Sequence, residues 1–442
     1  MAQQSIGVRL RCHLTLARRD MSDAVVETSQ RQTPAPGASN VHAGGTLFAL
    51  RHRNFRLYFA AQIVSNIGTW VQITVENWLV LELSHSGLAL GVTNALQFGP
   101  LIILGMYGGV VADRHDRRRL LMLTQTCLGL LALTVGVVAG IGIVRVWMIW
   151  LAAFALGVVK CFDEPALQSF IKDLVVPTDL PNAVAWANTI KATGRVVGPV
   201  LGGLVLTKVG LAPGFLINAA TFALVVVVLA KLCHRELSTR TPVPHASGQI
   251  REGLIYVFRD PVLAATTIIM IVVFATAYNF QISLALIAAE TLGGKSQVYG
   301  SLMSVLGLGA AVGSLILARR ARTGLPAILL WTGGLAVTQM VMAAVHDVSF
   351  LHAATFAYGV SAGLFSVTVI STLQSRTVED MRGRVMALYS ICFLGVCLVS
   401  GPAFGGLAQW IGVSGALRVS GSICAVVALT GVIAPRRFVL VV

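Results

Sequence analysis

The sequence predicts an all-α membrane protein with twelve transmembrane helices, arranged as two pseudo-symmetric bundles of six helices. Three observations lead to this prediction: an unusually apolar composition, a series of long apolar segments, and a motif that occurs once in each half of the chain. Of the 442 residues, 56% are hydrophobic and 12% are charged, and the mean hydropathy is +0.79. A soluble domain of ordinary composition is far more polar, so we expect lipid to surround much of this chain.

The apolar segments have the length that a membrane-spanning helix needs, which is roughly 20 residues for a hydrocarbon core of about 30 Å. A membrane β-barrel would instead show short segments of alternating polarity, so helices are expected. The predicted spans are 55–81, 88–112, 120–141, 147–168, 185–206, 213–232, 262–288, 298–318, 326–345, 350–373, 385–410 and 413–433.

Two polar stretches define the domain organisation. Residues 1–50 lack an apolar period and are expected to form a disordered cytoplasmic tail, within which Met21 is favoured as the translation start. Residues 235–260 contain two prolines and an amphipathic run at 250–258, and we expect a cytoplasmic linker there. The predicted six-helix bundles are therefore residues 51–234 and 261–442.

The net charge of +15 is distributed unevenly between the predicted loops. Basic clusters precede the first span, follow the second and the eighth, and lie between the sixth and the seventh, whereas the opposite loops contain only Arg145, Lys208 and Lys295. This is the positive-inside pattern, and it predicts a protein of the cell inner membrane with both termini in the cytoplasm. The same pattern accounts for the charge without nucleic acid, so we expect no nucleic-acid partner.

Several classes of chemistry leave no signal in the sequence. The seven cysteines show no paired spacing in the outer loops, which argues against disulfides. We find no Cys or His cluster with metal-ligand spacing, no nucleophile motif and no phosphate-binding loop. We therefore expect a protein that is not an enzyme, that needs no metal or other cofactor, and that is a monomer.

An internal repeat supports the division into halves. Residues 198–204, with the sequence GPVLGGL, recur as residues 401–407, with the sequence GPAFGGL, at an offset of 203 residues. Repeats of this kind are typical of transporters that have arisen by duplication.

Several motifs together resemble a known family. The segment from Gly109 to Arg119, GVVADRHDRRR, resembles the signature loop between the second and third helices of the major facilitator superfamily of transporters. The segments SNIGTW (65–70), FDEPA (162–166) and RGRVM (382–386) resemble the bacterial branch that contains the enterobactin exporter and drug:proton antiporters. The resemblance covers residues 52–434 and implies the major facilitator fold with transport by alternating access. The arginine that this family has in its fourth helix is absent, and Lys160 is the nearest basic residue.

The resemblance implies a set of gating residues. Glycines spaced by four, such as Gly194, Gly198 and Gly202, allow a neighbouring helix backbone to approach closely, and the resembled fold places such faces where the two halves meet. Ordinary helix packing is the alternative explanation. The gating candidates are Gly109, Asp113, Arg114, Arg117, Arg118, Gly198, Pro199, Gly202, Gly401 and Pro402.

Asp113 is predicted to latch the cytoplasmic gate. Its carboxylate would meet the start of the eleventh helix, where Thr377 and Asp380 have the spacing of a capping box. Arg117 or Arg118 would contact Asp173. The alternative is that Asp113 only offsets the neighbouring arginines.

Charged residues inside spans are costly and therefore indicate function. Glu76 is a candidate for binding a proton or a cationic substrate, and the alternative is a carboxylate that extends to the membrane interface. Asp163 and Glu164 lie at the same predicted depth as Lys191 and Arg195, so we expect a buried charge network. This network could couple transport to protons, or could only neutralise the charges.

Polar and aromatic residues of other spans are candidates for lining a substrate cavity, although half of them could serve helix packing instead. They are Trp70, Gln72, Asn94, Gln97, Tyr278, Asn279 and Gln281.

The function that these observations favour is proton-coupled efflux of an amphipathic small molecule, such as a drug, a siderophore or a secondary metabolite. A lipid or metabolite carrier of the same fold is the first alternative. A non-transporting membrane sensor is less favoured, because such proteins normally carry a sizeable soluble domain.

Overall fold

The computed structural model describes residues 49–232, 249–290, 296–320 and 323–433. These residues are helical or lie in short connections, and they contain no strand. Residues 1–48 of the predicted tail, with the Met21 start, and residues 235–248 of the predicted linker lie outside the described residues.

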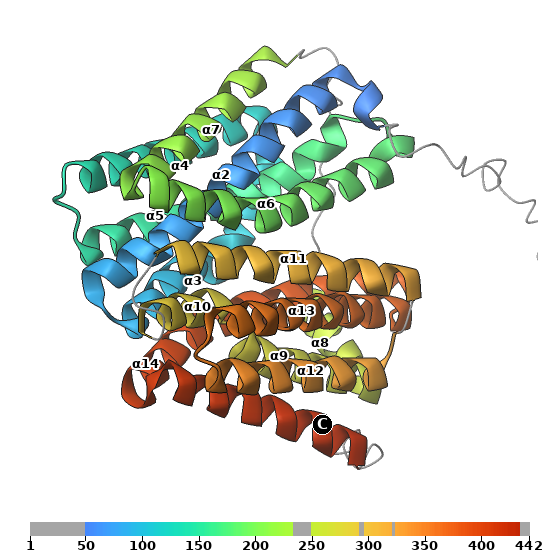
Figure 1. The fold of residues 1–442 in the computed structure, drawn as a ribbon. Helices are drawn as coiled ribbons and strands as arrows, with labels where there is room; N and C mark the ends of the chain where they lie inside the picture. Colours follow the sequence, from blue (N-terminus) through green and yellow to red (C-terminus); the bar gives the residue numbers. More distant parts are fainter. Residues whose placement is uncertain (1–48, 233–248, 291–295, 321–322, 434–442) are drawn as a thin grey trace, which may run out of the picture. The chain divides into compact units, whose positions relative to one another are not determined.

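The first half of the chain forms six long helices (Figure 1). They are α2 (Arg53–Ser84), α3 (Gly87–Arg114), α4 (Arg117–Gly140), α5 (Val146–Asp173), α6 (Leu180–Lys208) and α7 (Leu211–Lys231), with 3-10 turns η1 (Ala49–Arg51) and η2 (Pro177–Asp179). Side-chain caps fix two of the starts, since Ser86 accepts from the amide of Ala89 and Asp116 accepts from the amide of Arg119. Each of the first six predicted spans coincides closely with one of these helices.

The second half contains α8 (Gln249–Arg259), α9 (Pro261–Ala277), α10 (Phe280–Glu290), α11 (Ser296–Arg320), α12 (Leu325–Ala344), α13 (Val348–Arg376) and α14 (Glu379–Ile433). The amphipathic run at 250–258 of the predicted linker is helical and lies within α8. The predicted span 262–288 is interrupted at Tyr278 and Asn279, between α9 and α10. The last two predicted spans are one continuous element, α14, which turns at Gly412, where φ is 76° and only glycine is unstrained.

The helices pack mainly within their own half of the chain. In the first half α2 packs on α6 and α7, and α5 packs on α3 and α4; in the second half α13 packs on α11 and α12, and α14 packs on α9 and α12. The halves meet where α3 contacts α14 and where α6 contacts α11, as Figure 1 shows.

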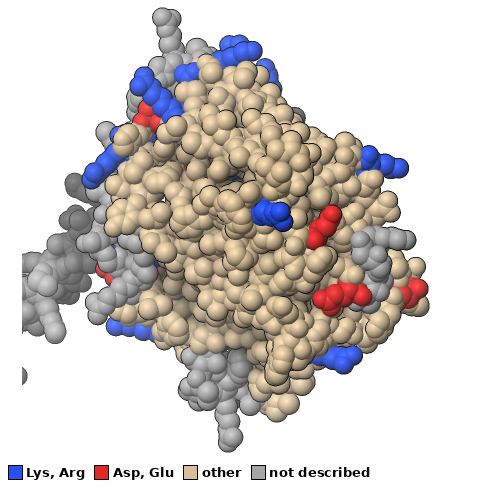
Figure 2. Space-filling model, turned by 90° about the vertical axis from the view of Figure 1, so that its left-hand side faces the viewer, with Lys and Arg blue, Asp and Glu red and all other residues tan. Residues whose placement is uncertain are grey.

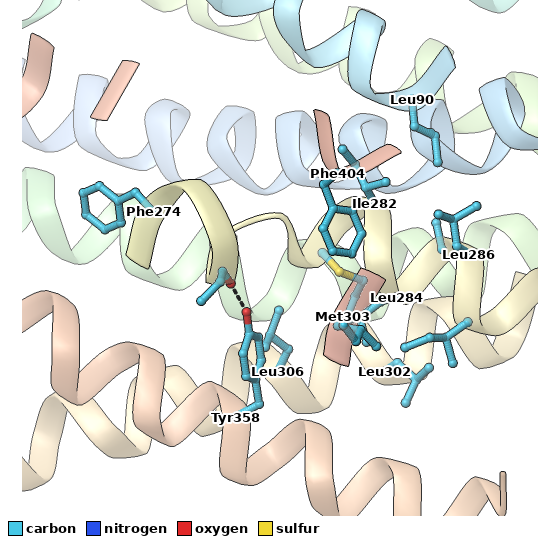
Figure 3. Packing of buried hydrophobic residues seen from close by; sticks show 14 of the residues in the cluster. Leu90, Phe274, Ile282, Leu284, Leu286, Leu302, Met303, Leu306, Tyr358 and Phe404 are labelled. Atoms are coloured by element: carbon cyan, nitrogen blue, oxygen red, sulfur yellow. Dashed lines mark hydrogen bonds between the residues drawn. The ribbon is translucent and has the colours of Figure 1, made fainter. Parts of the chain in front are cut away.

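A core of buried apolar side chains extends across this meeting of the halves. Phe274, Leu302 and Met303 of the second half are at most 2% exposed. They belong to one cluster with Leu90, which comes from α3. Figure 3 shows members of this cluster, and it shows the Tyr358 hydroxyl donating to the carbonyl of Ala277 at the end of α9. This bond satisfies one of the carbonyls that the interruption after Ala277 leaves without a helical partner.

The outer surface is apolar in the manner of a protein that contacts lipid. Large side chains such as Leu123, Leu151 and Leu315 are more than 60% exposed. Figure 2 shows a largely uncharged face, with most Lys and Arg side chains near its edges. Nine helical segments of the described chain are long and apolar enough to cross a membrane. The helices α2 and α6 are not among them, because polar and charged residues interrupt their apolar sequence. The long helix α14 is counted as one segment.

The halves are in close contact at the end where α2 finishes and α3 begins. A side chain at Gly91 would overlap the Gly401 carbonyl, and a Cβ atom at Gly203 would lie 2.7 Å from the Gly300 Cα atom. Asn77 Nδ2 donates to the Tyr299 hydroxyl at 3.4 Å, which joins α2 to α11 at the same end.

The other parts of α3 and α14 contain glycines without close neighbours in the part of the chain that the structure describes. Among the described residues, no atom of another segment lies within 4 Å of where a side chain would begin at Gly105 or Gly109 of α3, or at Gly383 or Gly395 of α14. The close approaches at glycines of α3 and α14 therefore run from Gly87 and Gly405 to Gly99 and Leu398, and none is found in the described chain at Gly105, Gly109, Gly383 or Gly395.

Candidate functional site

A cavity of about 90 Å³ lies among the helices of the first half. Because a single water needs roughly 10–15 Å³ measured this way, the cavity can hold several waters or part of a small molecule. It is lined by the polar side chains of Tyr58, Gln62, Ser65, Asn66, Thr69, Gln125, Lys160, Asp163, Glu164 and Lys191, with apolar residues between them.

Asp163 of α5 is held in this cavity by neutral donors. It is 4% exposed, and its Oδ1 atom accepts from Thr124 Oγ1 at 2.7 Å and from Gln125 Nε2 at 2.9 Å. Both donors belong to α4. The expected ion pair between Asp163 and a basic residue of α6 is absent from the described contacts, because Asp163 faces α4 rather than α6.

Glu164 occupies a different environment although it is the next residue. Its carboxylate lies 3.8 Å from Lys160 Nζ and 3.6 Å from Lys191 Nζ. The prediction that α5 and α6 are joined by an ion pair is thus confirmed for Glu164 and Lys191. Sequence reasoning did not place Lys160 in the network, although its spacing of four from Glu164 is the spacing at which helical side chains meet.

Arg195 is not part of this network. Its guanidinium lies 5.5 Å from the centre of the Trp70 ring, and the described residues provide no ion pair for it. Arg195 lies one helical turn beyond Lys191, and the Trp70 side chain packs on Gly194 and Gly198 of the same helix. The predicted pairing of Arg195 with Asp163 or Glu164 is wrong for this structure, because the tryptophan occupies the adjoining surface of α6.

Two buried acceptors of the cavity have no donor among the described residues. They are Asn66 Oδ1 and Gln125 Oε1, and Gln125 is only 4% exposed. Since the amide nitrogen of Gln125 donates to Asp163, its oxygen is the atom left without a partner. A donor-bearing group in the cavity, water included, would satisfy these oxygens.

Glu76 lies in a second polar cluster within the first half. It is 6% exposed, and its Oε1 atom accepts from Gln97 Nε2 of α3 at 2.9 Å. One turn earlier on α2, Gln72 Oε1 accepts from Asn218 Nδ2 of α7 at 2.7 Å. This burial excludes the alternative that Glu76 extends to the membrane interface.

The predicted cavity residues divide into three groups. Gln72 and Gln97 form hydrogen bonds inside the first half, with Asn218 and Glu76, and their place in a central substrate cavity stays a prediction. Trp70 lies beneath Arg195, Tyr278 donates to the Ala362 carbonyl at 2.9 Å, and Asn279 Oδ1 accepts from Ser400 at 3.2 Å. The remaining two, Asn94 and Gln281, are half-buried.

Tyr278 belongs to an aromatic cluster that the sequence did not reveal. The Phe274 ring centre lies 4.6 Å from that of Tyr278, 5.0 Å from that of Phe393 and 6.1 Å from that of Tyr389. Tyr278 and Tyr389 are also close enough to Arg195 of the first half to interact with it electrostatically. These rings come from α9 and α14, which are distant in sequence, so no local pattern could indicate the cluster.

The repeated glycine motif has different neighbours in its two copies. Gly198 and Gly202 pack on Trp70 and Thr74 of α2, within the first half, so the expectation that they form the meeting of the halves is wrong for this structure. Gly401 packs on Gly91 across the halves, as expected. Pro199 and Pro402 are accommodated inside α6 and α14. Gly109 has no neighbouring segment within 4 Å among the described residues.

The basic loop after α3 ties the first half together. Arg117 Nη1 donates to both carboxylate oxygens of Asp173 at 2.8 Å, which confirms that predicted contact. Arg118 instead donates to the carbonyls of Leu229 and Ala230, both at 2.7 Å, and so caps α7. Arg114 is exposed at the end of α3.

The latch at Asp113 lies outside the described side chains and stays a prediction. The capping box that the latch invoked is not present. Thr377 Oγ1 donates to the Leu373 carbonyl at 2.6 Å, which satisfies the end of α13 rather than the start of α14.

These features define a multi-pass α-helical membrane protein with buried carboxylates inside one half, an architecture that suits a secondary transporter. The family model described as "Transmembrane secretion effector" matches residues 44–439, and the chain belongs to this family of the major facilitator superfamily.

Relatives of known sequence and solved structure agree with this assignment. The uncharacterised transporter YfiS of Bacillus subtilis is 28% identical over 395 residues, covering 85% of this chain and 92% of YfiS. The enterobactin exporter EntS of Salmonella typhimurium is 26% identical over 392 residues, covering 84% and 89% of the two chains. A solved bacterial homologue of the lysosomal transporter Spinster has a TM-score of 0.64 at 13% identity, covering 88% of this chain and 97% of its own, which shows a shared fold.

Proposed function

We propose that this secondary transporter exports an amphipathic small molecule from the cytoplasm, driven by entry of protons. The observation that carries the proposal is that α3 and α14 pack closely near Gly91 and Gly401, whereas no described atom of another segment lies within 4 Å of a Cβ atom built at Gly105, Gly109, Gly383 or Gly395. In alternating access, one end of a site between two halves is closed while the other is open. The difference between the two ends of α3 and α14 supports the assignment of one such state.

The proposed topology is twelve spans, with bundles at residues 51–234 and 261–442, in the inner membrane with both termini cytoplasmic. Nine of the apolar segments are found directly in the described chain. The helices α2 and α6 add two spans, and division of α14 at Gly412 into two helices adds the twelfth. The basic residues Arg56, Arg114 and Lys172 belong to the end of the helices where Gly109 and Gly383 have no close neighbour among the described residues, and the positive-inside rule makes this end cytoplasmic. The state is then inward-open.

Two carboxylates are suited to carry protons. Glu76 and Asp163 are buried and accept hydrogen bonds from neutral side chains. Protonation of either carboxylate therefore breaks no described ion pair. Glu164 lies between two lysines, and its protonation would leave both unneutralised. Proton binding at Glu76 or Asp163 therefore costs less than proton binding at Glu164.

Export is the direction supported by the similarity to the enterobactin exporter EntS. A shorter match is to the staphyloferrin A transporter of Staphylococcus aureus. Both molecules named are small, and the proposed substrate is of the same class.

Inverted membrane vesicles containing the protein test the proposal. We expect vesicles energised with an internal acid pH to accumulate at least one member of a panel of labelled drugs, siderophores and lipids, and we expect a protonophore to abolish that accumulation. Vesicles without the protein are the control. Accumulation that ignores the proton gradient, or accumulation of lipids alone, would contradict proton-coupled export of an amphipathic small molecule.

A further inference from the structure

Arg195 is a cation inside a predicted span that has no carboxylate partner among the described residues. The nearby acids of the first half are already engaged, Asp163 by α4 and Glu164 by two lysines. The Arg195 side chain is exposed rather than enclosed by protein. Because a charge within a span is costly unless it is paired or functional, this arrangement needs an explanation.

The second half offers Arg195 aromatic rings and no acid. The described Asp and Glu residues of the second half lie in the short helix α8 or at helix ends, and they are Glu252, Asp260, Glu290, Asp347, Glu379 and Asp380. Tyr278 and Tyr389 of that half are close enough to Arg195 for their phenol groups to interact with it electrostatically. Both tyrosines belong to the aromatic cluster around Phe274. The ring centres of the other members lie 4.6–6.2 Å from the ring centre of Phe274.

Within the first half, Arg195 packs on the Trp70 ring. Its guanidinium stacks over the indole at 5.5 Å, and Trp70 is itself fixed because glycine at 194 and 198 leaves room for it on α6. An arginine oriented in this way keeps its remaining N–H groups free to bind an anion, and its planar shape suits a carboxylate or another planar oxyanion.

We propose that Arg195, Trp70, Tyr278 and Tyr389 bind a negatively charged aromatic group of the transported molecule. The proposal rests on the proposed transport function and specifies its substrate class. The guanidinium pairs with the anion, and the indole and phenol rings pack on the aromatic portion. A cationic substrate would be repelled here, since Lys191 lies one turn away on the same helix.

Binding of matched small probes to the full-length protein in lipid nanodiscs tests this directly, because it does not require transport. The probes are 2-naphthoate, its neutral isostere 2-naphthamide, and cyclohexanecarboxylate, which is anionic but not aromatic. Titration calorimetry should show that 2-naphthoate binds more tightly than either of the other probes.

Arg195→Gln should weaken 2-naphthoate binding by roughly tenfold or more and leave 2-naphthamide binding unchanged, since a hydrogen bond to a charged group is lost. This variant should fold, because it removes no described ion pair. The matched control is Arg145→Gln, which removes an exposed arginine at the start of α5 and should change neither probe.

Equal binding of 2-naphthoate and 2-naphthamide, or unchanged 2-naphthoate binding in Arg195→Gln, would overturn the substrate class. Failure of the transport proposal gives a different result. Binding of 2-naphthoate would still depend on Arg195, but vesicles would not accumulate any substrate in response to a proton gradient.

Discussion

At the scale of single residues, neighbouring carboxylates have separate environments. Asp163 and Glu164 are adjacent in sequence, yet one accepts hydrogen bonds from α4 and the other pairs with lysines of α5 and α6. Successive residues of a helix point about 100° apart, so adjacent side chains meet different neighbours. The sequence indicated that these residues form a charged cluster, but the division of partners depends on helix rotation, which no local pattern records.

Glu76→Gln should abolish the dependence of transport on the proton gradient while preserving exchange of labelled for unlabelled substrate. The glutamine can still accept from Gln97, but it cannot bind and release a proton. Glu82→Gln, at an exposed position on the same helix, is the matched control. Transport that remains driven by the gradient in Glu76→Gln would remove Glu76 from the coupling machinery.

Glu164 and Lys191 should be energetically coupled, whereas Glu164 and Arg195 should not. The pair is partly exposed, with side chains 36% and 52% accessible, so we expect a coupling of only about 0.5–1 kcal/mol. A double-mutant cycle of thermal unfolding with Glu164→Gln and Lys191→Met measures it, and the cycle with Arg195→Gln is the comparison. Equal coupling in the two cycles would contradict the observed pairing.

At the scale of helices, long apolar runs were sufficient to locate the elements. Each helix from α2 to α7 coincides with a predicted span, because a predominantly apolar segment of this length satisfies its backbone groups within a membrane only as a helix. The segments of α2 and α6 were located in this way although polar and charged residues interrupt them. The interruption at Tyr278 and Asn279 was not predictable, since no proline or glycine marks it. The neighbours of each glycine were also not predictable, because they depend on contacts between distant segments.

Gly91→Ala should loosen the contact of α3 with α14. The added methyl would overlap the Gly401 carbonyl, and overpacking of this kind costs about 1–3 kcal/mol. Such a cost changes the ratio of two conformations by roughly five- to 150-fold. A cysteine placed at Gln409, at the same end, should react faster with a maleimide in this background.

Gly105→Ala is the control for this experiment, because nothing within 4 Å of Gly105 in the described chain opposes the added methyl. Maleimide reactivity at position 409 should remain as in the parent. Identical reactivity in the two alanine variants would show that the contact at Gly91 does not hold the halves together.

At the scale of the whole molecule, the contact at one end predicts how the protein can be locked. Ser86 Oγ and Gln409 Oε1 are 3.4 Å apart and belong to different halves. Ser86→Cys with Gln409→Cys, in a background without the native cysteines, should form a disulfide on mild oxidation and stop transport. Reduction should restore transport, and each single variant should be insensitive to oxidant. Undiminished transport by the cross-linked protein would exclude alternating access at this contact.

The buried charge of the described molecule is confined to one half. Its buried acids are Glu76, Asp163 and Asp173, all before residue 233, whereas the buried polar residues after residue 249 are Thr, Ser and Gln. Under the proposed function, proton chemistry is then a property of the first half, and much of the substrate contact comes from the neutral aromatic cluster of the second. Such a division favours evolutionary change, because substitutions around Phe274 can alter what is carried while the proton-binding residues remain untouched. A family with this division can change its substrate while it keeps the same coupling to protons.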